Sequence, residues 1–233
     1  MSIYNILYWA AAVGCLSGRL MDEPLATTFD YIFKPMLMPL LAIILIAGGI
    51  KKWNKDHTLL IIALLFAFGG DMFLMLGREG LMLLLGLGSF LIMQILYIFL
   101  FLKDSTKPSF IRKNPLWIIP FAALGITFYI LSVPALAKDV IMLFAVAVYA
   151  AALVTMTITA LNRKNSVNEN SFKFVFTGAV LFLISDFIIG INQFIIKDFP
   201  YASFAIMITY ITGQYLIVKG FLKRNLETEK NSV

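Results

Sequence analysis

Residues 59–77 read LLIIALLFAFGGDMFLMLG and residues 174–194 read FVFTGAVLFLISDFIIGINQF, and each stretch is long and apolar enough to cross a lipid bilayer. Each stretch also carries one acid, Asp71 in the first and Asp186 in the second. An ionised side chain at the bilayer centre costs at least ~2.5 kcal/mol. Because no basic residue lies within a helical turn of either acid in the sequence, we expect both carboxyls to serve chemistry or transport.

The rest of the chain has the composition of a polytopic membrane protein. Hydrophobic residues make up 61% of its 233 residues and charged residues 14%, whereas roughly a quarter of the residues of a soluble domain are charged. The net charge of +6 does not indicate a nucleic-acid-binding protein, because the basic residues are spread over every loop and form no long block. We therefore expect an all-α membrane protein without a nucleic-acid partner.

Eight stretches approach the ~20 apolar residues that a membrane-spanning helix needs. They are residues 3–19, 34–50, 58–76, 80–102, 115–134, 139–161, 172–196 and 200–222. An even number of spans puts both termini on one side of the membrane. The connections are short, so we expect residues 1–233 to form a single transmembrane domain without a separate soluble part.

The distribution of basic residues predicts the orientation of these spans. The side that holds both termini also holds all but five of the 19 basic residues. Those five are Arg19, Lys34, Arg78, Lys138 and Lys197. Short loops rich in Lys and Arg stay in the cytoplasm. Both termini are therefore predicted to be cytoplasmic, in what we expect to be a bacterial cytoplasmic membrane.

This topology gives the two acids a common depth. The third and seventh spans both run outward from the cytoplasm, and a rise of about 1.5 Å per residue puts each acid roughly 20 Å above the cytoplasmic edge. If the two spans are neighbours, Asp71 and Asp186 can face each other across one cavity.

A short similarity indicates an internal repeat. Residues 89–93 read SFLIM and residues 203–207 read SFAIM, and each segment follows one of the two acids at nearly the same distance. The similarity predicts two parallel halves of four helices each, residues 1–102 and 115–222, related by an axis along the membrane normal. The two acids would then hold equivalent positions.

Several polar side chains in the apolar spans are candidates for lining such a cavity. They are Gln94 and Tyr97, Asn192 and Gln193, and Tyr210 and Gln214. Taken singly, buried amides and phenols usually form hydrogen bonds between helices. Taken together with two acids at one depth, they predict a polar pocket inside the bundle.

Two further features allow two interpretations each. Lys34, with Pro35, opens the second predicted span at its outer end, so it is either a cation that reaches up to the interface or part of an anion site for a phosphate head group. Gly69 and Gly70 either let helices pack closely or give a substrate access to Asp71.

The sequence also excludes several kinds of site. The one histidine, His57, lies in a predicted basic cytoplasmic loop, and no cluster of His, Cys and acids has the spacing of metal ligands. No glycine-rich phosphate loop and no Gly-x-Ser-x-Gly sequence is present. We therefore expect carboxylate chemistry without a metal or cofactor.

At these residues the sequence resembles the lysoplasmalogenase-like (YhhN-type) family of integral membrane proteins. The matching segments are KPMLMPLL at 34–41, FGGDMFLML at 68–76, GLGSFLIMQILYI at 86–98, LFLISDFIIGINQF at 181–194 and TYITGQYLI at 209–217. The resemblance implies eight helical spans and hydrolysis of the vinyl ether bond of a lysoplasmalogen to a fatty aldehyde and a glycerophospho-choline or -ethanolamine. The implied partner is therefore a lysophospholipid or a related amphiphilic lipid.

The resemblance also implies residue roles. It puts catalysis on Asp71 and Asp186, and a lining role on Lys34, Asn192, Tyr210 and Gln214. Gln94 departs from the family pattern, in which many members carry His at this position. Any role of a titrating imidazole there is lost or passes to water.

Two carboxyls suit this reaction. A vinyl ether hydrolyses by protonation of its β-carbon, and water captures the resulting oxocarbenium ion. Desolvation can keep one buried Asp protonated as the acid, while a second, ionised carboxylate stabilises the cation. Glycosidases divide two acids in the same way. The sequence leaves the assignment open, although the two glycines beside Asp71 favour it slightly as the donor.

Two other functions fit the same residues. Acids at membrane depth, a repeat and a polar pocket are also features of proton-coupled transporters and channels. Alternatively, the acids of a lipid-binding or structural protein would only hold helices together.

A reporter fused after residue 233 tests the orientation. We expect a cytoplasmic reporter to be active there and a periplasmic one to be silent. Periplasmic activity at that position would overturn the predicted topology.

Overall fold

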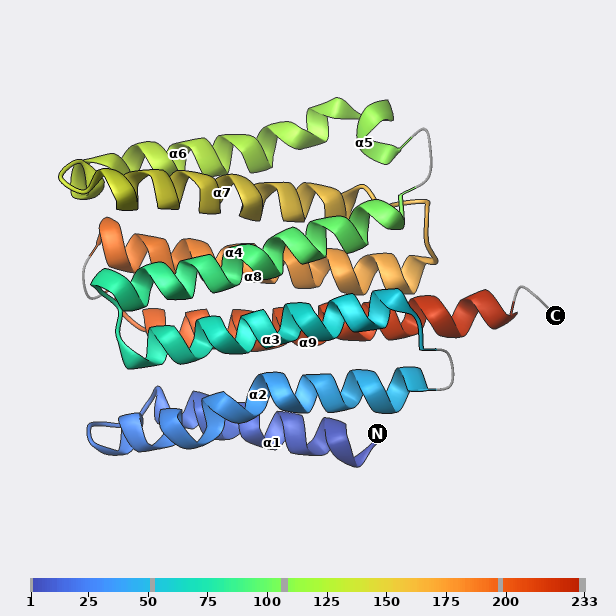
Figure 1. The fold of residues 1–233 in the computed structure, drawn as a ribbon, viewed down its shortest axis with the longest axis horizontal. Coiled ribbons are helices and arrows are strands. Elements are labelled where there is room, and N and C mark those ends of the chain that lie inside the picture. Colours follow the sequence, from blue (N-terminus) through green and yellow to red (C-terminus); the bar gives the residue numbers. More distant parts are fainter. Residues whose placement is uncertain (1, 51–52, 106–108, 197–198, 231–233) are drawn as a thin grey trace.

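The computed structural model describes residues 2–50, 53–105, 109–196 and 199–230, with side chains as far as residue 224. The described residues form only helices and connecting turns. These helices are α1 (Ile3–Gly18), α2 (Leu25–Gly49), α3 (Lys55–Leu76), α4 (Gly80–Lys103), α5 (Phe110–Lys113), η2 (Pro115–Trp117), α6 (Ile118–Leu136), α7 (Val140–Leu161), α8 (Glu169–Phe194) and α9 (Ala202–Lys230). Figure 1 shows the long helices running alongside one another, with both chain ends at the same end of the bundle.

The predicted membrane character is confirmed for most of the spans. Among the described residues, seven helices are long and apolar enough to cross a membrane, as expected of an integral membrane protein. α1 is shorter, at 16 residues, or roughly 24 Å of helix. The count of eight spans, the orientation of the termini and the repeat of residues 1–102 and 115–222 stay predictions. Lys197 and residue 233, which the topology used, lie outside the described residues.

The prediction for the second span was wrong at its outer end. The sequence placed the start at residue 34, because Lys34 and Pro35 look like the opening of a helix. In the structure α2 begins at Leu25, and both Pro35 and Pro39 lie inside it. Proline is tolerated within membrane helices because neighbouring groups satisfy the freed carbonyls. As a result Lys34 stands well inside the bundle rather than at its edge.

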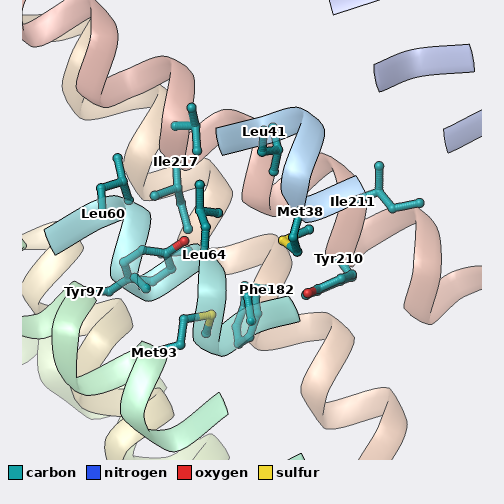
Figure 2. Close-up of a cluster of buried hydrophobic side chains, with 14 of the residues drawn as sticks. Met38, Leu41, Leu60, Leu64, Met93, Tyr97, Phe182, Tyr210, Ile211 and Ile217 are labelled. Carbon is teal, nitrogen blue, oxygen red and sulfur yellow. The ribbon is translucent and has the colours of Figure 1, made fainter. Parts of the chain in front are cut away.

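The core of the bundle is formed by buried apolar side chains from most of the long helices. Its largest cluster of buried side chains comes from all the long helices except α6. Figure 2 shows part of this cluster, to which α2, α3, α4, α8 and α9 each contribute. Tyr97 and Tyr210 carry hydroxyls into this apolar region, so their polar atoms need partners inside the protein.

Glycines let two pairs of helices approach closely. A Cβ on Gly178 of α8 would lie 2.6 Å from the carbonyl oxygen of Gly213 of α9, and a Cβ on Gly70 of α3 would lie 2.6 Å from the ring of Phe90 of α4. The packing interpretation of Gly69 and Gly70 is therefore confirmed. Neither of these two glycines lines a pocket described below, so the access interpretation gains no support.

A network of charges joins the helix ends that lie near the chain termini. Arg163, which follows α7 and is fully buried, pairs with Asp104 at the end of α4 at 2.8 Å. Arg224 of α9 also pairs with Asp104, and it pairs with Asp56 of α3 at 3.0 Å. The guanidinium of Arg163 also lies over the ring of Phe221. Because the network connects α3, α4, α7 and α9, we expect it to hold this end of the bundle together.

The variant Arg163→Ala tests this role. We expect it to lower the free energy of unfolding by about 3 kcal/mol, near the lower limit for a broken buried pair because Arg224 still pairs with Asp104. Lys173→Ala removes the exposed pair of Lys173 with Glu169 and should leave stability unchanged. Thermal unfolding in detergent compares the two variants, and equal losses would contradict a structural role of Arg163.

Candidate functional site

Asp71 lies in a buried polar cluster formed by three helices. Its carboxylate on α3 is 3% exposed. The Lys34 Nζ of α2 stands 3.5 Å from Asp71 Oδ1, and the Tyr210 hydroxyl of α9 donates a hydrogen bond of 2.7 Å to Asp71 Oδ2. A carboxylate with a cation and a hydrogen-bond donor on its two oxygens is stabilised in its ionised form.

The structure thus corrects the interpretation of Lys34 as an interfacial cation. Its side chain is buried, at 6% exposed, and faces Asp71 instead of reaching the membrane surface. Asp71 does have a basic partner, but that partner comes from another helix and is far away in sequence. Because α2 starts earlier than predicted, Lys34 reaches the depth of Asp71.

Asp186 of α8 has different surroundings. The hydroxyl of Tyr149, on α7, donates a hydrogen bond to Asp186 Oδ2. Within the described part of the chain Asp186 forms no ion pair. It is half-buried, and a carboxyl that is desolvated without a cation favours its neutral form.

Gln94 of α4 stands behind Tyr149. Its amide lies near the Tyr149 hydroxyl, and the whole side chain is buried. Neither its nitrogen nor its oxygen has a well-formed hydrogen bond to any described residue. An unsatisfied buried amide is costly, so Gln94 has hydrogen-bonding capacity left for water or for a ligand beside Tyr149.

Both carboxyls line one pocket, which we call the polar pocket. It is lined by Arg19, Lys34, Asp71, Leu74, Arg78, Leu83, Phe90, Ser185, Asp186, Ile189, Asn192, Gln193, Ser203, Ile206, Met207 and Tyr210. Its cavity volume is about 60 Å³, which is enough for several water molecules. α3 and α8 are not among the helix pairs that pack extensively on each other in the described part of the chain, and the two acids share this pocket.

A second pocket adjoins the first, and we call it the apolar pocket. It is lined by Leu74, Leu83, Leu87, Phe90, Phe128, Val146, Tyr149, Ala150, Leu153, Asp186, Phe187, Ile189 and Gly190, with a cavity volume of about 50 Å³. These residues come from α3, α4, α6, α7 and α8. Asp186 lines both pockets, whereas Asp71 lines the polar pocket alone.

The other predicted site residues divide into two groups. Asn192 lines the polar pocket, and its side-chain oxygen accepts a hydrogen bond of 3.0 Å from the Phe199 backbone. Tyr97 and Gln214 line neither pocket; the Tyr97 hydroxyl donates to Gln214 Oε1 at 2.6 Å. This bond between α4 and α9 is the structural role that single buried phenols and amides usually have. Gln94 also lines neither pocket.

The sequence did not reveal three residues of the site. Tyr149 contacts Asp186 from α7, but no polar pattern surrounds it in the sequence. Arg19 and Arg78 line the polar pocket and follow the ends of α1 and α3. In the sequence they stand out only as two of the few basic residues on the predicted outer side. That feature indicates the topology of the chain and does not by itself indicate a site.

A comparison with protein families found one match. The family model described as the YhhN family matches residues 29–221. The chain belongs to the YhhN family. The match includes both acids, Lys34, Tyr149 and Tyr210, but not Arg19. No curated protein and no solved structure matches the chain.

The buried pair of Lys34 and Asp71 can be tested by stability. We expect Lys34→Gln to lower the free energy of unfolding by about 3 kcal/mol, because it leaves a buried carboxylate without its cation. Adding Asp71→Asn to Lys34→Gln should recover most of this loss, because no buried charge then remains.

Thermal unfolding in detergent of the wild type, both single variants and the double variant gives the coupling between the two side chains. Additive losses in the double variant would contradict a direct interaction between Lys34 and Asp71.

Proposed function

We propose that this YhhN-family protein is a lysoplasmalogenase, which hydrolyses the vinyl ether bond of a lysoplasmalogen-type lysophospholipid or a related ether lipid inside the membrane. In this proposal Asp186 is the general acid, and Asp71 is the carboxylate that stabilises the cation. The reaction and the substrate class rest on the family resemblance. The assignment of roles rests on the surroundings of the two carboxyls.

The observation that carries the assignment is the unequal environment of two acids in one pocket. Asp71 faces the ammonium group of Lys34, whereas Asp186 faces the neutral hydroxyl of Tyr149. Two carboxyls with such different partners are kept in different protonation states, as in other enzymes that divide acid and base roles. This reverses the slight preference for Asp71 as the donor that its two glycines gave.

The first step is proton transfer to carbon. Tyr149 donates to Oδ2 of Asp186, so the acidic proton of Asp186 is carried on Oδ1. Asp186 gives this proton to the β-carbon of the vinyl ether, and the electron pair of the double bond forms the new C–H bond. An oxocarbenium ion and an Asp186 carboxylate result. The ionised Asp71 lies in the same pocket and offsets the positive charge.

The second step is capture of the cation by water. The polar pocket has room for water. A water molecule adds to the oxocarbenium carbon and gives its proton to the Asp186 carboxylate, which restores the acid. The resulting hemiacetal then breaks its C–O bond to the glycerol oxygen; the hydroxyl loses its proton as the carbonyl forms, and the glycerol oxygen gains a proton. One water is consumed, and the products are a fatty aldehyde and a free glycerol hydroxyl.

Release of aldehyde by the purified protein tests the reaction. Lysoplasmalogen is supplied in detergent micelles, and the aldehyde is detected by mass spectrometry. We expect Asp186→Asn to lower kcat by roughly 10²–10⁴-fold, the usual contribution of a general acid, and Asp71→Asn to lower it by roughly 10²–10³-fold. Asp22→Asn, which changes an exposed acid outside both pockets, should leave kcat unchanged.

Full activity in either pocket variant would exclude the proposed mechanism. The alternative of a proton-coupled transporter predicts a different result. A labelled lysolipid would then cross the membrane of liposomes that contain the protein, and no aldehyde would form.

A further inference from the structure

Asp186 stands at the junction of two pockets of opposite character. The polar and apolar pockets share Leu74, Leu83, Phe90, Asp186 and Ile189. Asp186 is the only ionisable acid among these shared residues. A ligand that extends from one pocket into the other would therefore lie beside Asp186 and these four apolar side chains.

The apolar pocket suits a hydrocarbon chain. Apart from Asp186 and the Tyr149 hydroxyl, its lining side chains are aliphatic or aromatic, and they come mainly from α4, α6, α7 and α8. Such a surface gains free energy by burying methylene groups, at about 0.8 kcal/mol for each buried CH₂. It offers no partner for a phosphate or a glycerol hydroxyl beyond the two polar groups at Asp186.

Two arginines, Arg19 and Arg78, line the polar pocket and are absent from the lining of the apolar pocket. Arg78 is exposed, and it lines the polar pocket near Arg19 and Asp30. Arg19 pairs with Asp30 of α2 at 2.5 Å and donates to the Ser203 hydroxyl at 2.8 Å, and its Nε is buried without a described partner. Guanidinium groups bind phosphate oxygens with two parallel hydrogen bonds.

We propose that the two pockets form one composite lipid site, in which a single hydrocarbon chain lies in the apolar pocket and a phosphate group lies at Arg19 and Arg78. Asp186 lines both the apolar pocket and the polar pocket, and the lining of the polar pocket also includes the two guanidinium groups. This arrangement is compatible with the order of chain, ether bond, glycerol and phosphate in a single-chain ether phospholipid. The proposal rests on the proposed function for the reaction at Asp186, but binding in this orientation does not require hydrolysis.

Phe128 of α6 is the side chain that a bound chain displaces. Its ring stands on Gly190 of α8, where an added Cβ would lie 2.3 Å from Phe128 Cζ, and both residues line the apolar pocket. The pocket is narrow in this structure, so a chain must push the ring aside. The ring also packs edge-on against Phe187, with 5.0 Å between the ring centroids, and contacts the buried core. A bound chain must therefore replace these contacts with its own.

Binding of a saturated ether lysolipid tests the chain position. The probe is 1-O-hexadecyl-glycero-3-phosphocholine, which has no vinyl ether and stays intact. Ala150 and Ala151 both line a third pocket between α6 and α7, but only Ala150 also lines the apolar pocket. Ala150→Phe and Ala151→Phe are therefore matched variants that differ at the apolar pocket. We expect Ala150→Phe to raise the Kd at least ~10-fold, which corresponds to the loss of one or two buried methylenes, and Ala151→Phe to leave it unchanged. Equal Kd values for the two variants would overturn the chain site.

A variant that widens the apolar pocket should strengthen binding instead of weakening it, and an unfolded protein could not give this result. Phe128→Ala should tighten binding of a lysolipid probe whose chain ends in a bulky pyrene group, provided that the melting temperature shows a folded protein. Weaker binding of this probe by folded Phe128→Ala would also overturn the chain site.

The phosphate position is tested by a second pair of variants and a second probe. Arg78→Gln should raise the Kd of the phosphocholine probe at least ~10-fold, as expected for the loss of one charge-assisted hydrogen bond. It should not change the Kd of 1-O-hexadecylglycerol, which has no phosphate. Lys138→Gln removes an exposed cation outside both pockets and should affect neither probe. Equal losses for both probes in Arg78→Gln would overturn the phosphate site.

The two proposals fail separately. If the probes bind with this pattern but lysoplasmalogen yields no aldehyde, the composite lipid site stands and the proposed hydrolysis falls. If aldehyde forms and Ala150→Phe and Ala151→Phe have the same KM, the hydrolysis stands and the chain site falls.

Discussion

The ion pair between Lys34 and Asp71 is the interaction on which the site depends. Hydrocarbon offers no water to stabilise a charge, so a charge inside a membrane helix needs a partner from the protein. Lys34 of α2, Asp71 of α3 and Tyr210 of α9 provide each other with partners. This cluster joins three helices, and it lies beside the polar pocket. In the proposed mechanism the same contact therefore serves both stability and chemistry.

The second acid, Asp186, differs from Asp71 in the partners of its carboxyl. Asp186 has the Tyr149 hydroxyl on one oxygen and no cation among the described residues. Its carboxyl therefore differs from that of Asp71, although both acids line the polar pocket. The difference arises from the helices that face each acid, since α3 meets the lysine of α2 and α8 meets the tyrosine of α7. Two acids that look equivalent in sequence thus have different partners, and the proposed division of roles rests on this difference.

The site residues that could be predicted from the sequence are those whose placement inside a membrane span costs free energy. Asp71 and Asp186 stood out because an acid inside an apolar span is expensive, and the structure brings both to one pocket. Tyr149 could not be found in this way, because a tyrosine in a membrane helix is inexpensive and common. Tyr97 and Gln214 were grouped with the site because of their depth, but depth does not specify direction, and their side chains bond to each other between α4 and α9.

The sequence by itself determined that the chain is a bundle of membrane-length helices with two acids inside it, because hydrophobic length and the cost of buried charge are local properties. The tertiary structure alone decided the partners of these acids. Lys34 reaches Asp71 only because α2 starts at Leu25, well before the lysine, and continues through Pro35 and Pro39. Asp186 joins a polar and an apolar pocket only because α4, α6, α7 and α8 surround it. Helix packing sets these contacts through the shape and position of side chains from distant segments, and no local pattern encodes them.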